Sequence, residues 1–279
     1  MKVLKKNSYA KLNFGLQVLN KRSDGFHNIN SVFIRINLHD KMRFSVSNDF
    51  SINSNFSIPV KKNIIFKTLE VLSEHFDKDL FKLKIDLNKK IPAGAGLGGG
   101  SSNAAETIKA CTELFDIKAE REEINSLAAR IGSDVPFFLQ NSSAIGKSKG
   151  EKLEPFDFDM PFHILIVFPN IHISTPEAYK MLNRTEIPQK EINFKTFLNK
   201  FVLERMQLEK NIINDFELPV FELQPELRSI KEKLYDVGSE FAIMSGSGSS
   251  VFGLFNDHKK AEKAAESFDE YQTFITEKI

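Results

Sequence analysis

The chain has 279 residues, of which 41% are hydrophobic, and its 38 Lys and Arg nearly balance its 37 Asp and Glu, giving a net charge of +1. This composition is typical of a globular protein with a substantial core, and the balanced charge gives no electrostatic reason to expect nucleic acid or a membrane surface as a partner. A single cysteine, Cys111, excludes an internal disulfide and favours a reducing, cytoplasmic setting.

The first third of the chain predicts two strands, a helix and a third strand. Residues 9–20 alternate, with the apolar side chains on one face and Lys11, Asn13 and Gln17 on the other. An Asp24-Gly25 turn follows, and residues 31–38 alternate again. Helical spacing over 62–76, with Asn63 as N-cap, precedes a strand over 81–88.

The middle of the chain predicts helices on either side of a short loop. Ala104, Ile108, Cys111 and Phe115 form a helical stripe, on which Cys111 is expected to be a core residue and not a nucleophile. A second helix over 121–132 ends at Gly132. The N-terminal residues lack the apolar region of a signal peptide, so no targeting segment is expected.

The last part of the chain predicts a second set of strands and helices. The apolar run 162–168 lies between prolines and is far shorter than the roughly 20 residues of a membrane helix, so it is read as a buried strand. A helix starts with Thr175 as N-cap and Pro176 in its first position, and another runs over 225–238. Strand, loop and strand fill 240–255, before a helix capped by Asp257. The alternation favours an α+β fold over a doubly wound sheet, with domains over 1–155 and 156–279.

The run "IPAGAGLGGGSSNAA", residues 91–105, concentrates glycine between a strand and a helix. A glycine-rich loop that enters a helix N-terminus presents backbone N–H groups without intrahelical partners, and these favour an anion. Ser101 and Ser102 add hydroxyl donors. Hydrogen bonds to a charged oxygen contribute roughly 1.5–3 kcal/mol each, against about 0.3–1 kcal/mol from the helix dipole, so they would dominate phosphate binding.

Other readings of the run fit less well. A flexible linker is seldom placed between a strand and an apolar-striped helix. The spacing Gly94-x-Gly96-x-x-Gly99 formally matches a dinucleotide fingerprint, but "NKKIP" separates it from its strand and several elements precede it. No Gly-Lys-Ser/Thr ends the run, so it is not a P-loop.

The glycine run resembles the phosphate-binding motif of the GHMP kinases, the family of galactokinase, homoserine kinase, mevalonate kinase and phosphomevalonate kinase. Five other stretches agree in order with members that act on a cytidylyl substrate in the non-mevalonate isoprenoid pathway. These stretches are "AKLNFGL" with "RSDGFHNINSVF", "IGSDVPFFL", "ISTPEAY" and "SGSGSSVF". Together the matches span residues 9–255.

The resemblance implies a two-domain ATP-dependent kinase with its active site in the cleft between the domains. It implies Lys11 and Asp134 as the catalytic pair, ATP and Mg²⁺ as cofactors, and a small-molecule partner. The ATP-binding residues carried over are Lys89, Pro92, Gly94, Ala95, Gly96, Leu97, Gly98, Gly99, Gly100, Ser101, Ser102 and Asn103. The substrate-binding residues are Asn13, Phe26, His27, Phe33, Tyr179, Gly246, Ser247 and Gly248, with Phe26 and Tyr179 on either side of the base. The sequence names no convincing protein ligand for Mg²⁺; Ser102 is the one candidate.

Two positions depart from the family pattern. Phe26 stands where the family commonly has Tyr, which keeps the stacking surface but loses a hydroxyl. Ser247 stands in a loop that is commonly Gly-Thr-Gly, and there the hydroxyl remains.

The residues taken alone leave simpler readings open. Lys11 on a polar strand face could be solvated, Asp134 could cap the short helix "VPFFL", His27 could be a surface histidine, and Tyr179 could be a half-buried aromatic. Alternative functions are a GHMP kinase for a smaller alcohol such as homoserine or mevalonate, an NAD-dependent oxidoreductase, or an inactive nucleotide-binding module. Oligomeric state does not follow from the sequence.

Overall fold

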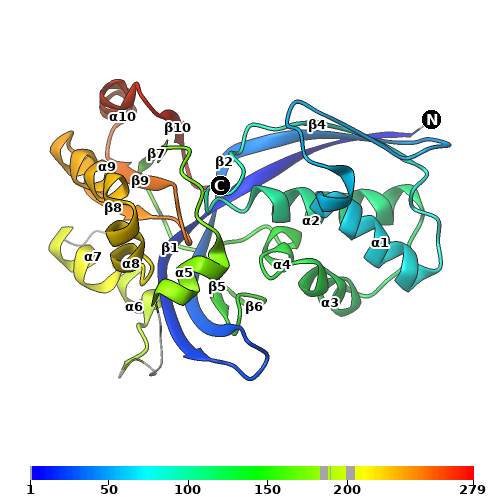
Figure 1. Ribbon diagram of the computed structural model, residues 1–279, viewed down its shortest axis with the longest axis horizontal. Helices are drawn as coiled ribbons and strands as arrows, with labels where there is room; N and C mark the ends of the chain where they lie inside the picture. The colour runs from blue at the N-terminus through cyan, green and yellow to red at the C-terminus, as the bar shows by residue number, and fades with distance from the viewer. Residues whose placement is uncertain (1, 183–187, 189, 199–204) are drawn as a thin grey trace. The chain divides into compact units, whose positions relative to one another are not determined.

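The computed structural model describes residues 2–182, 188, 190–198 and 205–279, which form two compact units (Figure 1). Unit 1 comprises residues 1–10, 38–93 and 98–141, and unit 2 comprises residues 11–37, 94–97 and 142–279. The long strands β1 (Val3–Lys21) and β2 (His27–Val46) each contribute to both units. The sequence-based division into residues 1–155 and 156–279 stays a prediction.

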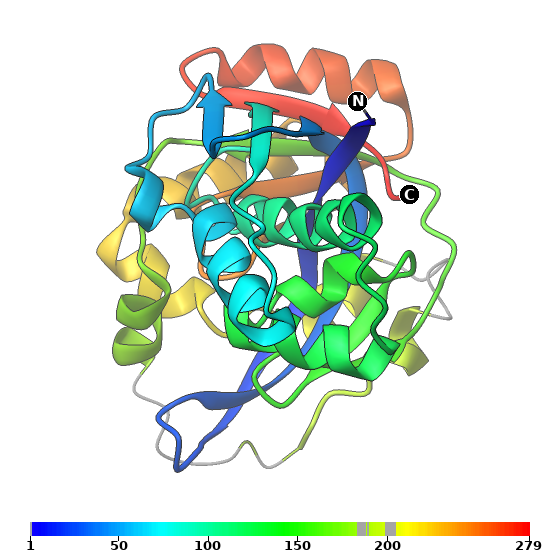
Figure 2. The ribbon, with the colours of Figure 1, turned by 90° about the vertical axis from the view of Figure 1, so that its right-hand side faces the viewer.

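Unit 1 has helices on one side of its strands. Besides the start of β1 and the end of β2, it contains β3 (Ser51–Ser54), η1 (Val60–Lys62), α1 (Ile64–Phe76), β4 (Leu83–Asn88), α2 (Gly99–Leu114), α3 (Arg121–Ile131) and α4 (Val135–Leu139). β4 is antiparallel to β2 and parallel to β3. Helices α1 and α2 lie side by side against the strands (Figure 2).

The core of unit 1 follows from the predicted alternation. Met42 and Phe44 of β2 and Ile85 of β4 point inward and are buried, as are Leu69 of α1 and Ile108 of α2. Cys111 is buried among them, and burial raises the pKa of its thiol to about 12. The prediction that Cys111 is a core residue is therefore confirmed, because a thiol with this pKa is protonated and inert at neutral pH.

Unit 2 contains the rest of β1 and β2 together with a second, four-stranded antiparallel sheet. Its other elements are β5 (Ala144–Lys147), β6 (Lys152–Pro155), β7 (His163–Phe168), α5 (Thr175–Leu182), α6 (Phe194–Leu198), α7 (Arg205–Asn211), α8 (Glu217–Leu223), α9 (Pro225–Asp236), β8 (Phe241–Met244), β9 (Val251–Phe255), α10 (His258–Ala265), η2 (Glu266–Phe268) and β10 (Gln272–Thr276). The second sheet has the order β10-β7-β9-β8. α9 packs on β8 and β9, and α10 packs on β7, β9 and β10. The fold is α+β, as predicted.

Two helix caps agree with the sequence and two do not. Asn63 accepts a hydrogen bond from Ile65 N, and Asp257 accepts from Lys259 N and Lys260 N, as predicted. The helix predicted to be capped by Thr175 is instead preceded by Ser174, whose Oγ lies 2.6 Å from Glu177 Oε2 in a reciprocal capping arrangement. Asp134 occupies the N-cap position of α4, but its side chain makes no capping hydrogen bond, so the alternative reading of Asp134 as a helix cap is not supported.

Candidate active site

The first half of the glycine run, residues 94–97, belongs to unit 2 and is bound to the rest of that unit by backbone hydrogen bonds. Ser250 N donates to Ala95 O at 3.2 Å, and Lys11 N donates to Leu97 O at 3.0 Å. Gly96 has φ +76°, and a Cβ added there would lie 2.2 Å from Ser245 O. The backbone therefore approaches so closely that only glycine fits at this position.

The second half of the run starts helix α2 in unit 1. Gly98 is the N-cap residue in a left-handed conformation (φ +69°) and has no side chain to satisfy the first amides. The first intrahelical bond runs from Ser102 N to Gly98 O, at 2.9 Å. The amides of residues 99–101 thus precede the helical ladder, which is the arrangement that binds anions at helix N-termini.

Lys11 and Asn13 form a buried polar pair on β1. The Lys11 ammonium donates to Asn13 Oδ1, Asn13 Nδ2 donates to Ser31 Oγ at 2.8 Å, and Ser31 Oγ donates to Gly15 O at 2.8 Å. Lys11 is 4% exposed and Asn13 is 2% exposed. The reading of this face as a solvated strand surface is therefore wrong, since unit 2 covers the polar face of β1 as well as its apolar face.

Phe33 and the loop of residues 245–248 lie beside the same pair. The Lys11 ammonium is 5.5 Å from the centroid of the Phe33 ring. Ser245 Oγ accepts from Asn13 N at 3.2 Å and donates to Gly96 O at 3.0 Å. Unit 2 thus brings together Lys11, Asn13, Phe33, the first half of the glycine run and the 245–248 loop, all predicted from widely separated motifs.

Asn214 supports the 245–248 loop from behind. Its Nδ2 donates to Met244 O and Gly246 O, both at 2.8 Å, and it is 4% exposed. Ser247 Oγ lies 3.1 Å from Thr175 Oγ1, which links the loop to the start of α5. Asn214 had no signal in the sequence, because an asparagine outside a turn motif does not reveal its tertiary partners.

The predicted base-binding residues lie in unit 2, where two of them, His27 and Tyr179, stack on each other. The rings of His27 and Tyr179 stack with centroids 4.7 Å apart at 11°, and Phe216 meets Tyr179 edge-on. Phe26 is 51% exposed, with the Lys149 ammonium 4.8 Å from its ring centroid. Rings at 4.7 Å are in direct stacking contact. A base that stacks on Tyr179 would therefore use its other face or displace His27.

The hairpin that carries Phe26 and His27 is tied to the turn at residues 147–151. Arg22 binds Asp24 through two hydrogen bonds to Oδ2 and one to Oδ1, and it also donates to Ser148 Oγ at 2.6 Å. Ile29 N donates to Ser148 O at 2.6 Å. The Arg22 guanidinium, which donates to Asp24, lowers the pKa of that carboxyl. These bonds link the hairpin to the turn at residues 147–151.

Burial lowers the pKa of His27 below its ordinary 6.5, and the positive charge of Lys21 adds to this effect. The folded chain therefore binds fewer protons at His27 than the unfolded chain does once the pH falls below about 6.5. We expect the free energy of unfolding to decrease on acidification from pH 7.5 to 5.5 by more in the wild type than in His27→Gln. Urea unfolding at the two pH values measures this, and equal decreases would contradict it.

In unit 1, Asp134 is half-buried at the start of α4. Lys109 fixes this helix to α2 by donating to Phe138 O at 2.8 Å and to Glu106 Oε1 at 2.7 Å. Lys89, carried over as an ATP-binding residue, places its ammonium 2.6 Å from the fully buried Asp40, and its role in ATP binding stays a prediction. Asp40 was not predicted as a site residue.

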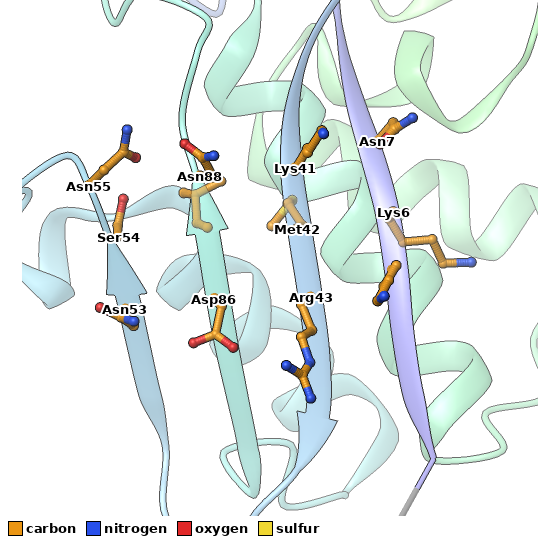
Figure 3. A pocket seen from close by; sticks show the side chains of 12 residues that line it. Lys6, Asn7, Lys41, Met42, Arg43, Asn53, Ser54, Asn55, Asp86 and Asn88 are labelled. Carbon is orange, nitrogen blue, oxygen red and sulfur yellow. The ribbon is translucent and has the colours of Figure 1, made fainter.

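A separate pocket of about 780 Å³ lies on the face of unit 1 that is turned away from its helices (Figure 3). Polar side chains of four neighbouring strands line it, among them Asn7, Lys41, Arg43 and Asp86. Arg43 and Asp86 are directly opposite each other in the β2–β4 register. None of the predicted site residues lines this pocket.

The described part of the chain holds no group of three or more His, Cys, Asp or Glu that could bind a metal ion. Ser102, the one hydroxyl considered as a Mg²⁺ ligand, is 1% exposed and accepts a hydrogen bond from Ser8 Oγ at 2.8 Å. Within the same described residues, no helix has the length and apolar character needed to cross a membrane.

Comparison with known proteins gives consistent matches over nearly the whole chain. Models of the GHMP kinases N terminal domain and of the GHMP kinases C terminal region match residues 63–142 and 201–272. The 4-diphosphocytidyl-2-C-methyl-D-erythritol kinase of Thermodesulfovibrio yellowstonii is 36% identical, covering 95% of this chain and 94% of that protein. The one of Parabacteroides distasonis is 38% identical, covering 88% of this chain and 89% of that protein.

Solved structures agree with these matches. A crystal structure of 4-(cytidine 5'-diphospho)-2C-methyl-D-erythritol kinase has a TM-score of 0.82 at 28% identity and covers 98% of both chains. A homoserine kinase from Cytophaga hutchinsonii has a TM-score of 0.67 at 16% identity, covering 100% of this chain and 98% of that one, a likeness of fold alone.

Proposed function

Because the chain belongs to the GHMP kinase family, we propose that it transfers the γ-phosphoryl group of ATP to the 2-hydroxyl of 4-diphosphocytidyl-2-C-methyl-D-erythritol, in the non-mevalonate isoprenoid precursor pathway. The observation that carries this proposal is the 36–38% identity to kinases named for that substrate, over most of both chains. The single, buried cysteine supports a cytoplasmic location.

In the proposed reaction, the substrate hydroxyl attacks the γ-phosphorus, the bond from the γ-phosphorus to the β–γ bridging oxygen breaks, and ADP leaves. Phosphoryl transfer asks mainly for positioning and charge stabilisation. We assign Asp134 to orient the hydroxyl and accept its proton late in the transfer. We assign Lys11 to stabilise the charge that develops, a role supported by its hydrogen bond to Asn13, which fixes the direction of the ammonium.

The proposed phosphate site is the glycine run. The amides of residues 99–101 at the start of α2 and the glycine backbone of residues 94–98 would donate to phosphate oxygens. Mg²⁺ would enter with ATP, where it supplies charge neutralisation between phosphate oxygens. Such an ion would keep most of its waters and take few protein ligands. Ser102 is the one side chain that we consider for it, and its hydroxyl, 1% exposed and bonded to Ser8 Oγ, would have to turn toward the ion.

The proposed cytidine site comprises Phe26, His27 and Tyr179, together with Asn13 and Phe33. Stacking of a base on an aromatic ring is sequence-tolerant and contributes about 1–3 kcal/mol. The exposed ring of Phe26 is available for such a contact, since 51% of the residue is solvent-accessible. The stack of His27 on Tyr179 supports a site that rearranges when a base enters.

We expect Tyr179→Ala to raise KM for the cytidylyl substrate by about 5- to 150-fold, the equivalent of 1–3 kcal/mol of lost stacking. KM for ATP should stay within about twofold, because Tyr179 is not among the residues proposed to bind ATP. Steady-state kinetics with each substrate varied measures both constants. Tyr179→Phe keeps the ring and should behave as wild type; an unchanged KM in Tyr179→Ala would remove this residue from the site.

One assay tests the proposed function against its alternative. ADP release is measured with the cytidylyl substrate and with a panel of smaller alcohols that includes homoserine and mevalonate, at matched concentrations. The proposal expects turnover with the cytidylyl substrate and at most trace activity with the others. Preferential turnover of a small alcohol would make the chain a different GHMP kinase.

A further inference from the structure

Asp40 is a fully buried carboxylate that the proposed reaction does not use. It lies on β2, on the inward face shared with Met42 and Phe44, and it is 0% exposed. A buried carboxylate is costly unless it is paired and hydrogen-bonded. Asp40 receives four hydrogen bonds of 2.6–2.9 Å from two segments of unit 1, residues 89–91 and Asn103 of α2.

We propose that Asp40 is a positioning residue for nucleotide binding, because it fixes both ends of the glycine run within unit 1. This inference rests on the proposed function, since it assigns the residue to the ATP site of that kinase. Asp40 itself is not proposed to touch ATP; it acts through the groups that it holds.

One carboxylate oxygen holds the chain where it enters the glycine run. Asp40 Oδ1 accepts from Lys90 N at 2.7 Å and from Ile91 N at 2.8 Å. Asn55 holds the preceding residue from the other side, with Lys89 N donating to its Oδ1 at 2.7 Å and its Nδ2 donating to Lys89 O at 3.0 Å. The entry backbone of residues 89–91 is therefore fixed by four hydrogen bonds to two side chains.

The second carboxylate oxygen holds the helix that follows the run. Asp40 Oδ2 accepts from Asn103 Nδ2 at 2.9 Å, and Asn103 Nδ2 also donates to Ser8 Oγ at 2.8 Å. Ser8 Oγ in turn donates to Ser102 Oγ at 2.8 Å. The start of α2, whose amides are proposed to bind phosphate, is thus tied to Asp40 directly and through Ser8.

Oδ2 also neutralises Lys89 beside this helix start. The Lys89 ammonium lies 2.6 Å from Oδ2 and 3.3 Å from Asn103 Oδ1. A Cβ added to Gly99 would lie 3.1 Å from the same ammonium, so Lys89 passes directly over the first residue of α2. A cation at the positive end of a helix dipole is unfavourable, and the carboxylate of Asp40 offsets that repulsion.

Asp40→Asn distinguishes the hydrogen bonds that Asp40 makes to the entry backbone from those that it makes to α2 and Lys89. Its remaining carbonyl oxygen can still accept from Lys90 N and Ile91 N, but its new amide N–H₂ faces two other donors, Lys89 Nζ and Asn103 Nδ2. The entry bonds are kept, while the bonds to α2 and Lys89 are replaced by donor–donor conflict. We expect the dissociation constant for ATP to rise about 10- to 100-fold, the equivalent of losing about one hydrogen bond of roughly 1.5–3 kcal/mol between a backbone amide and a charged phosphate oxygen.

The test uses the full chain and isothermal calorimetry with ATP alone, followed by kinetics with each substrate varied. Asp40→Asn should raise the ATP dissociation constant and KM for ATP, with KM for the cytidylyl substrate within about threefold of wild type. Thr68→Val is the matched control, since Thr68 is also fully buried in unit 1 but makes its hydrogen bond within α1, to Ile64 O at 2.8 Å, and none to residues 89–105. It should lose stability but bind ATP as wild type does.

Ser8→Ala keeps the test decisive if Asp40→Asn does not fold. It removes only the link from Asn103 to Ser102, so a smaller rise of about two- to tenfold in the ATP dissociation constant is expected. Wild-type ATP affinity in both variants, or an equal loss in Thr68→Val, would overturn the positioning role. A wild-type chain that binds no ATP would instead overturn the proposed function, so the two failures are distinguishable.

Discussion

Asp134→Asn is expected to lower kcat by about 10²- to 10⁴-fold, the range in which a positioned general base contributes. The amide has nearly the shape of the carboxylate but cannot take the proton of the substrate hydroxyl. KM for ATP should change little, because the glycine run and not Asp134 is proposed to hold the phosphates. Steady-state rates with the cytidylyl substrate at saturating ATP measure the loss.

The effect of Asp134→Asn on folding has to be separated from the loss of the proton acceptor. The Asp134 side chain makes no capping hydrogen bond to α4, so its replacement removes no cap. The melting temperature of Asp134→Asn is the control for folding: a fall of about 2 °C corresponds to about 1 kcal/mol in a chain of this size, and a much larger fall would mean that the variant loses structure as well as the proton acceptor. A variant that keeps most of its turnover would remove Asp134 from the proposed mechanism.

Gly96→Ala is expected to abolish most activity through the backbone alone. The residue has φ +76°, and the added Cβ would lie 2.2 Å from Ser245 O and 3.1 Å from Gly248 O. Either the glycine run or the 245–248 loop must move by about 1 Å to relieve the contact, and displacements of that size cost about 10²-fold in rate. We expect kcat/KM for ATP to fall by at least that factor.

Gly238→Ala separates the two causes that act at Gly96. Gly238 has φ +94° at the end of α9, and nothing lies within 4 Å of its added Cβ. It therefore carries the conformational strain, about 1–2 kcal/mol, without the clash. Gly238→Ala should lower the free energy of unfolding by about this amount and leave kinetics unchanged. Equal kinetic effects in the two variants would mean that strain, and not close approach, explains the glycine at 96.

The predicted elements that agree with the structure are those with strong local signals. Asn63 and Asp257 cap their helices because their side chains reach amides two or three residues away, a contact that needs no tertiary partner. The strands over 9–20 and 31–38 follow from period-two alternation. By contrast, β3, β5, β6 and β10 were not predicted, since such short segments become strands through neighbours such as β4 for β3 and β7 for β10.

The motifs behind the family resemblance contain most of the candidate site residues. The residues that hold those site residues in place were not predicted. Asp40 had one signal: by period-two alternation it falls on the same face as the apolar Met42 and Phe44, where an acidic residue is out of place. Asn214, which holds Gly246, had none. Ser174 replaced Thr175 as the helix cap, because Ser174 is paired with Glu177 at the spacing of a capping box.

Local features could be predicted from the sequence alone. These are the alternating strands, the starts of helices, and a glycine-rich loop whose amides are open to an anion. The partners of each polar group were decided only by the fold. Lys11 stands on a polar strand face by pattern, yet it is 4% exposed and bonded to Asn13 because unit 2 covers that face. Periodicity reports which side a residue occupies, whereas burial and hydrogen bonding depend on segments distant in the chain, whose positions no short stretch encodes.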